Sequence, residues 1–324
     1  MAITLAEAKV GMADKIDQQV ADMFRRSSLL LDKMIFDNSI SPGTGGSTLA
    51  YGYIQLKTPS TASTRAINTE YSANEAKREK KVTEAIIMGG SFELDRVIQD
   101  TSGAINEMSF QFEQKIKATA NYFHNLVING QKSTGGEGFT DNTFDGLRKL
   151  LEGSSTEVTS KLSLKTEDEM KTNTFAFLDE MDNFLSTMDG IPTMLMMNTA
   201  MLNKFRSIAR RAGYYNQSRD DFGRVVESYN GIILMDAGKY YNGSATVDTI
   251  ATSSAGKTSI YAVNLGFDGF HGISPTGSSV IKTYVPDLKS PGAVKKGEVE
   301  LIAGVALKNT LKAAVLKDVT ISGE

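Results

Sequence analysis

The run from Ala251 to Thr258, ATSSAGKT, is the part of this chain whose residue types could do chemistry at a recognisable spacing. In a phosphate-binding loop, backbone amides, a lysine and a hydroxyl hold a nucleotide phosphate and magnesium. The first position here is an alanine instead of the glycine that the tight turn needs. The residues that follow, Ser259 to Val263, favour a strand, so no helix N-terminus would face the phosphates. We therefore predict a surface turn; a nucleotide-dependent enzyme using Lys257 and Thr258 is the alternative.

Other residues suited to catalysis or metal binding are few. The acidic cluster from Thr166 to Glu169 could bind a metal ion, but a threonine followed three residues later by glutamate also forms a capping box at a helix start. We predict the cap. The chain has no cysteine, and its two histidines are His124, in a helical stretch, and His271, in a glycine-rich run that predicts a turn. We expect no catalytic residue, no metal site and no cofactor, and therefore no enzyme.

Composition limits the class of protein. The 324 residues carry a net charge of -3, and 40% are hydrophobic and 23% charged, which is ordinary for a folded protein of two domains. This charge excludes a generally basic protein that coats nucleic acid. The sequence has no run of 18 apolar residues and no signal peptide, so we expect no membrane span and folding in a cytosol.

A long helix from Ser102 to Ile128 is the clearest structural prediction. Its apolar side chains recur in steps of three or four residues, which places them on one stripe, and Asn129-Gly130 favours an end to the helix. At 1.5 Å per residue it would be about 40 Å long. The predicted core residues of this helix are Ile105, Met108, Phe112, Ile116, Ala120, Phe123 and Val127.

Residues 47 to 91 alternate polar and apolar side chains and predict a long two-stranded hairpin. Strands are expected at Ala50–Lys57 and Lys80–Met88, with a turn at Thr58–Arg65. An isolated hairpin is marginal in water, and no nearby segment offers obvious apolar cover, so it should lie on something else. Its charges form either a solvated surface or contacts that set register with a neighbouring subunit. The candidate inter-subunit residues are Arg65, Glu70, Lys77, Arg78, Lys80, Lys81 and Glu84.

The remaining segments read as an N-terminal helix over residues 5 to 35 and, from about residue 150, an alternation of helices and strands. Helices are predicted at 175–188 and, capped by Thr199, at 200–212. Strands are predicted at 194–197, 231–235, 258–263 and 280–285, and the tail from Glu298 to Ile321 is β-like with a short interruption.

In this order the segments resemble the major capsid proteins of tailed bacteriophages, the α+β Hong Kong 97-type fold. Local likenesses lie at Phe144–Leu147 and Gly266–Phe270. The resemblance implies an N-terminal arm and entry to the P-domain (residues 1–46), an extended E-loop hairpin (47–91) and a P-domain with a long spine helix (92–149). It further implies an α/β A-domain (150–289) and P-domain return strands (290–324).

The resemblance implies a structural protein that self-assembles into hexamers and pentamers of an icosahedral shell around double-stranded DNA. The implied place is the virion, assembled in the bacterial host cytoplasm. The implied partners are other copies of the chain, portal and scaffolding proteins, and packaged DNA held non-specifically, with no membrane. An encapsulin-type compartment shell shares this fold and remains an alternative interpretation. A tail-tube protein is a further alternative.

Overall fold

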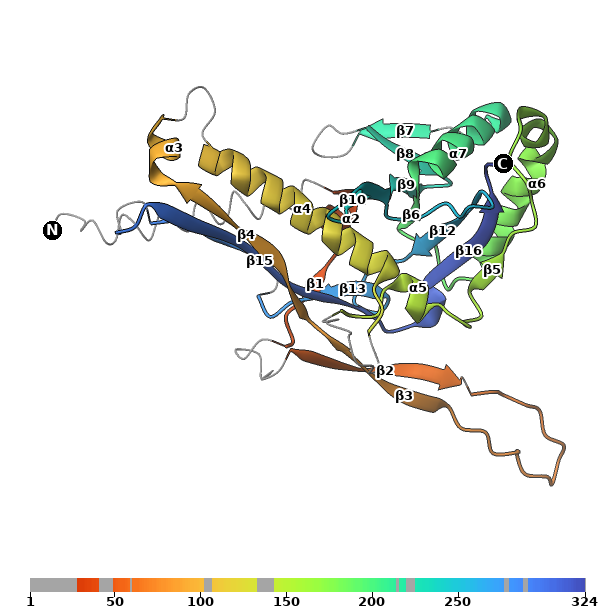
Figure 1. Ribbon diagram of the computed structural model, residues 1–324. Helices are drawn as coiled ribbons and strands as arrows, with labels where there is room; N and C mark the ends of the chain where they lie inside the picture. Colours follow the sequence, from red (N-terminus) through yellow and green to blue (C-terminus); the bar gives the residue numbers. More distant parts are fainter. Residues whose placement is uncertain are drawn as a thin grey trace.

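The computed structural model describes residues 28–40, 49–58, 60–101, 107–132, 143–213, 216–219, 225–276, 280–287 and 291–323. It consists of two packed β-sheets with helices on their faces and a two-stranded ribbon that projects from the body (Figure 1). The two sheets meet beneath the long helix α4, Glu107–Asn129, and the projecting ribbon leaves the body below them in the same view.

The first sheet is built on two long strands, β4 (Ile86–Asp95) and β15 (Val294–Leu307), which pair antiparallel over ten residues. Strand β14 (Ile281–Tyr284) and strand β13 (Phe270–Ile273) also pair with β15, and β1 (Phe36–Asp37) pairs parallel with β13. Helix α4 lies along β4 and β15, while α3 (Arg96–Thr101) follows β4. Helix α2 (Leu29–Lys33) begins at the capping residue Ser28.

The predicted long helix is confirmed over the described residues. Ile116, Ala120, Phe123 and Val127 are almost fully buried. Met108 and Phe112 are half-buried, and the remaining member of the predicted stripe, Ile105, lies outside the described residues. The ring of Phe112 meets that of Phe92 on β4 edge-on, with centroids 4.8 Å apart. The stripe therefore becomes more buried toward the C-terminal end, where α4 reaches both sheets.

The second sheet has the order β5-β16-β12-β6-β9-β8-β7. Helices α6 (Glu167–Ser186) and α7 (Thr199–Ala212) pack on one face through Leu195 and Met197 of β6, whereas Met194 and Met196 join the core that contains α4. Side chains of a strand alternate between faces, so this one sheet serves both cores. Its strands are β5 (Glu157–Thr159), β16 (Ala313–Thr320), β12 (Lys257–Val263), β6 (Met194–Met197), β9 (Ile232–Asp236), β8 (Val225–Tyr229) and β7 (Asn216–Arg219).

Short elements connect these sheets. Helix α5 (Leu147–Leu150) follows α4, and β10 (Lys239–Tyr241) and β11 (Thr246–Asp248) form a small hairpin. The 3₁₀ turn η2 (Thr310–Lys312) is the predicted interruption of the tail. The tail strands were expected to return together, but β15 pairs with β4 and β16 pairs with β12, because η2 redirects the chain into the second sheet.

The predicted hairpin needs a correction at its second strand. The ribbon consists of β2 (Ala50–Thr58) and β3 (Lys77–Glu84), and the strand predicted over 80–88 is divided at Ala85. The backbone amide of Ala85 donates to the carbonyl of Leu49 at 2.8 Å, and β4 then begins its own pairing with β15. The link between β2 and β3 is also longer than the predicted turn at 58–65, because β3 begins only at Lys77.

Three further predictions are wrong in detail. Helix α7 is capped by Asn198, whose side-chain oxygen accepts from the Met201 amide, instead of by Thr199. His271 lies in the buried strand β13 and not in a turn, because Phe270 and Ile273 pack into the core on either side of it. The N-terminal helix was expected to continue to residue 35, but α2 ends at Lys33 and the next residue is extended; residues 5–27 lie outside the described part. The capping box of Thr166 and Glu169 is confirmed.

Candidate assembly interface

The outer face of the β2–β3 ribbon is an exposed apolar surface on the element that projects from the body. Register pairs Ile54 with Lys80, Leu56 with Arg78 and Gly52 with Val82, so these residues share one face. Ile54 is 64% exposed, Leu56 56% and Val82 52%. We call these three residues, with Arg78 and Lys80, the outer arm face; Figure 1 shows the ribbon projecting from the body below the two sheets.

The inner face of the same ribbon is anchored on the protein's own body. Tyr51 and Tyr53 are buried in a small core with residues of β13 and β15, Ile273 and Ala306. The amide nitrogen of Gln55 donates to the Leu307 carbonyl at 3.1 Å. The hairpin was expected to lie on something other than a nearby segment, and at its base the cover comes from β13 and β15, at the far end of the sequence.

A polar contact fixes the base of the ribbon to β1. The hydroxyl of Tyr51 donates to Oδ2 of Asp37 at 2.9 Å. Burial by itself raises the pKa of Asp37, but hydrogen bonds from Ser39 and from Tyr51 outweigh it, and the pKa lies below 3.8. Burial and the Asp37 contact raise the pKa of Tyr51, so its hydroxyl stays protonated and donating. The ring of His271 packs at the edge of Tyr51, with centroids 5.9 Å apart.

The charged residues predicted as inter-subunit contacts are exposed along the ribbon and its connecting loop, but they do not converge on one site. Glu84 forms an ion pair with Lys132 at 2.8 Å, and Lys81 forms one with Glu79 at 3.1 Å. The guanidinium of Arg65 lies 5.4 Å from the centre of the Tyr71 ring. Exposed residues with no ion pair among the described residues are Glu70, Lys77, Arg78 and Lys80.

Sequence reasoning missed the apolar part of this face. Ile54, Leu56 and Val82 were not among the candidate contacts, although their alternation with polar residues was visible in the sequence. A period of two shows that a strand has an apolar face, but it does not show whether that face is covered. Only the position of the ribbon outside both cores shows that it is left open.

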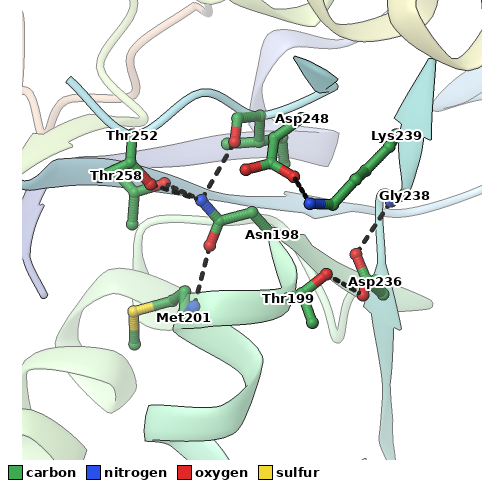
Figure 2. A network of polar contacts seen from close by, with 10 residues as sticks. Asn198, Thr199, Met201, Asp236, Gly238, Lys239, Asp248, Thr252 and Thr258 are labelled. Carbon is green, nitrogen blue, oxygen red and sulfur yellow. Dashed lines mark hydrogen bonds and ion pairs between the residues drawn. The ribbon is translucent and has the colours of Figure 1, made fainter. Parts of the chain in front are cut away.

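The motif from Ala251 to Thr258 forms the predicted turn and leads into strand β12. The amide of Asn198 donates to Thr252 Oγ1 at 2.9 Å and to Thr258 Oγ1 at 3.1 Å, and also to the carbonyl of Ile250 (Figure 2). Asn198 thus ties the start of α7 to both ends of the turn. No helix follows the turn, so it lacks the helix N-terminus on which a nucleotide-binding loop depends.

Within the described ranges, no group of three or more histidine, aspartate and glutamate side chains is arranged to hold a metal ion. Over the same ranges, no helix is both long and apolar enough to cross a membrane.

Two sheets, a long helix lying across them and a projecting ribbon define a shell-forming protein of the Hong Kong 97-type fold, as predicted. A family model described as SU10 major capsid protein matches residues 55–260. The chain belongs to that family, and it is a structural phage major capsid protein, not an enzyme. A search of curated protein sequences finds no match.

Solved structures agree on the fold. The holo-SrpI encapsulin complex from Synechococcus elongatus PCC 7942 is 14% identical with a TM-score of 0.61, covering 90% of this chain and 87% of that chain. A chain of the solved structure of Mycobacterium phage Bobi is 12% identical with a TM-score of 0.55, covering 92% of this chain and 91% of that chain. The capsid of Myoviridae phage XM1 is 14% identical with a TM-score of 0.53, covering 90% and 91%.

Proposed function

We propose that this capsid protein forms hexamers and pentamers that close an icosahedral shell around double-stranded DNA, and that assembly occurs in the bacterial host cytoplasm. The proposed partners besides other copies are portal and scaffolding proteins, with DNA held non-specifically through its phosphates. We further propose that the outer arm face, together with Arg65, Glu70, Lys77, Lys81 and Glu84, contacts a neighbouring copy.

The observation that carries this proposal is the outer arm face. Its three apolar side chains are more than half exposed although they lie on a regular strand pair. Burying apolar surface contributes about 25 cal/mol per Å², so a partner that covers this face gains stability. A long exposed strand pair normally risks uncontrolled pairing, whereas in a closed assembly a neighbour covers it. Repeated head-to-tail contacts that close generate rings.

Shortening the arm tests the proposal. The backbone amide of Thr61 lies 3.3 Å from the side-chain oxygen of Asn74, so the two sides of the loop approach each other there. Residues 62–73 can therefore be replaced by two glycines without separating β2 from β3. We expect a folded subunit with an unchanged thermal unfolding midpoint that no longer forms closed particles in electron microscopy. Normal particles from this variant would contradict a role of the connecting loop, with Arg65 and Glu70, in assembly; the variant keeps the outer arm face, which the substitution Ile54→Asp tests.

A compartment shell of the encapsulin type is a second candidate because one solved structure with this fold is an encapsulin complex. The two functions differ in what the shell encloses. Particles purified from the native host should contain nuclease-protected double-stranded DNA if the chain is a phage capsid protein. A cargo protein in place of DNA would support the compartment shell.

A further inference from the structure

A cavity of about 380 Å³ opens where the C-terminal end of α4 and helix α5 approach strands β12 and β16. The turn that resembles a phosphate-binding motif forms one wall, through Ser253 and Lys257. Three cationic side chains line the cavity, those of Arg148, Lys257 and Lys317, against one carboxylate, that of Asp318. This concentration of positive charge is unexpected on a chain with a net charge of -3.

Local backbone geometry gathers these side chains. On β12, Lys257, Ser259 and Tyr261 are two residues apart, so they share the face that lines the cavity. On β16, Thr258 pairs with Val319 but Ile260 pairs with Leu316, so the extra residue of a bulge lies on β16. Asp318 has a φ of 61° at this bulge. A bulge redirects side chains, and here both Lys317 and Asp318 line the cavity.

Two hydroxyl groups that line the cavity are available to form hydrogen bonds with a ligand. Tyr261 is only 4% exposed, yet among the described residues its hydroxyl has no hydrogen-bond partner, and neither has that of Ser259. Burial raises the pKa of Tyr261 above 10, so the hydroxyl keeps its proton and can donate to a ligand. The Tyr261 oxygen itself is not fully buried, so it is open to the cavity that Tyr261 lines and can donate to a ligand there.

The charges around the cavity are only partly neutralised. Lys317 is ion-paired with Glu157. The ammonium of Lys257 is 3.8 Å from the Asp318 carboxylate, and both side chains are nearly half exposed, so this pair is weak. Arg148 has no ion pair within the described part of the chain. The neighbouring carboxylate of Glu152 is already held by Lys149 at 2.7 Å.

We propose that this cavity binds a phosphate group, either as inorganic phosphate or as a phosphodiester of nucleic acid. The planar guanidinium of Arg148 can donate two parallel hydrogen bonds to phosphate oxygens. Lys257 adds a second positive charge, and Tyr261 with Ser259 adds hydroxyl donors from the strand. Donors on several walls suit a tetrahedral anion better than a planar carboxylate. Hydrogen bonds from Asn198 to Thr252 and Thr258 hold the two ends of the turn (Figure 2). Ser253 and Lys257 lie between these two threonines. The site belongs to the folded subunit and does not depend on shell formation.

The test uses the full-length chain in an unassembled form, at constant ionic strength. Inorganic phosphate is titrated in a calorimeter, with acetate as the comparison anion, and a labelled short DNA duplex is titrated by fluorescence anisotropy. The variants are Arg148→Ala and Tyr261→Phe, which removes only the hydroxyl. The control is Lys171→Ala, an exposed lysine on α6 that does not line the cavity. Thermal unfolding confirms that each variant is folded.

We expect phosphate to bind saturably and more tightly than acetate, with affinity reduced on the order of tenfold by Arg148→Ala and several-fold by Tyr261→Phe. Lys171→Ala should bind as the wild type does. If only the duplex binds, with the same dependence on Arg148 and Tyr261, the ligand is a phosphodiester; if only inorganic phosphate binds, it is the free anion. Binding of neither, equal binding of acetate, or binding unaffected by both cavity variants overturns the proposal.

Discussion

Tyr51 and Asp37 are joined by a hydrogen bond of 2.9 Å that links the base of the projecting ribbon to strand β1. The contact fixes the ribbon at the point where it leaves the body, since Tyr51 is buried and the outer part of the ribbon is not. The hydrogen bond therefore anchors the base of the ribbon on the first sheet.

Tyr51→Phe should lower the free energy of unfolding by about 1–2 kcal/mol, because the carboxylate of Asp37 loses a buried hydrogen-bond donor. Urea denaturation measures the change. Tyr71→Phe is the matched control, since Tyr71 lies in the exposed connecting loop and should unfold as the wild type does. Equal stability of Tyr51→Phe and the control would show that the contact is not a stabilising anchor.

Ile54→Asp should reduce particle formation without a comparable loss of subunit stability, because Ile54 is exposed in the subunit and is proposed to be buried in the shell. Ile54→Val keeps an apolar side chain and should still assemble. Sedimentation velocity separates subunits from shells. If the aspartate variant assembles normally, the outer arm face is not an interface.

Ile116→Ala on α4 should lower the free energy of unfolding by about 2–5 kcal/mol, as large-to-small substitutions in a packed core do. Phe112→Ala should destabilise less than an equally large change in a fully buried site, since Phe112 is only half-buried. Phe110→Ala, on the same helix but 44% exposed, is the control and should change stability by less than about 1 kcal/mol. A loss below that value for Ile116→Ala would mean that the stripe is not a core.

His124 should make stability depend on pH between about 6.5 and 4. Burial lowers the pKa of His124 from 6.5 to about 4, so the folded protein keeps the ring neutral while the unfolded chain takes up a proton. The contribution of His124 to the free energy of unfolding is fully present above pH 6.5. As the pH falls below 6.5, this contribution decreases by about 1.4 kcal/mol per pH unit until the folded-state pKa is reached. His124→Gln should remove this part of the slope, which urea denaturation at several pH values measures. If the slope is unchanged in His124→Gln, a group other than His124 causes the pH dependence.

Asn198→Ala should lower the free energy of unfolding by about 1–3 kcal/mol, because it removes the cap of α7 and leaves the half-buried Thr252 and the buried Thr258 without their donor. Asn198→Asp separates the two effects. The aspartate can still accept from the Met201 amide, but it cannot donate to the threonines. If Asn198→Asp is as stable as the wild type, only the cap contributes to stability and the bonds to the threonines do not. Thermal denaturation compares the stabilities of the two proteins.

Local patterns in the sequence determined much of the secondary structure. The 3.6-residue stripe of α4, the capping box of Thr166 and Glu169, and the buried strand Met194–Met197 are set by neighbours within a few residues, so spacing was enough to predict them. The order of such segments along the chain also determined the resemblance to a capsid fold.

Only the tertiary structure decided which segments distant in sequence meet. Strand β15 covers the base of the ribbon and pairs with β4, while β16 enters the other sheet, and no local signal distinguishes these two tail strands. The cavity around Arg148 and Tyr261 likewise needs α5, β12 and a bulge in β16 to come together. Periodicity shows that a strand has two different faces. What covers each face depends on packing between residues that are distant in the sequence, and no local sequence pattern records that packing.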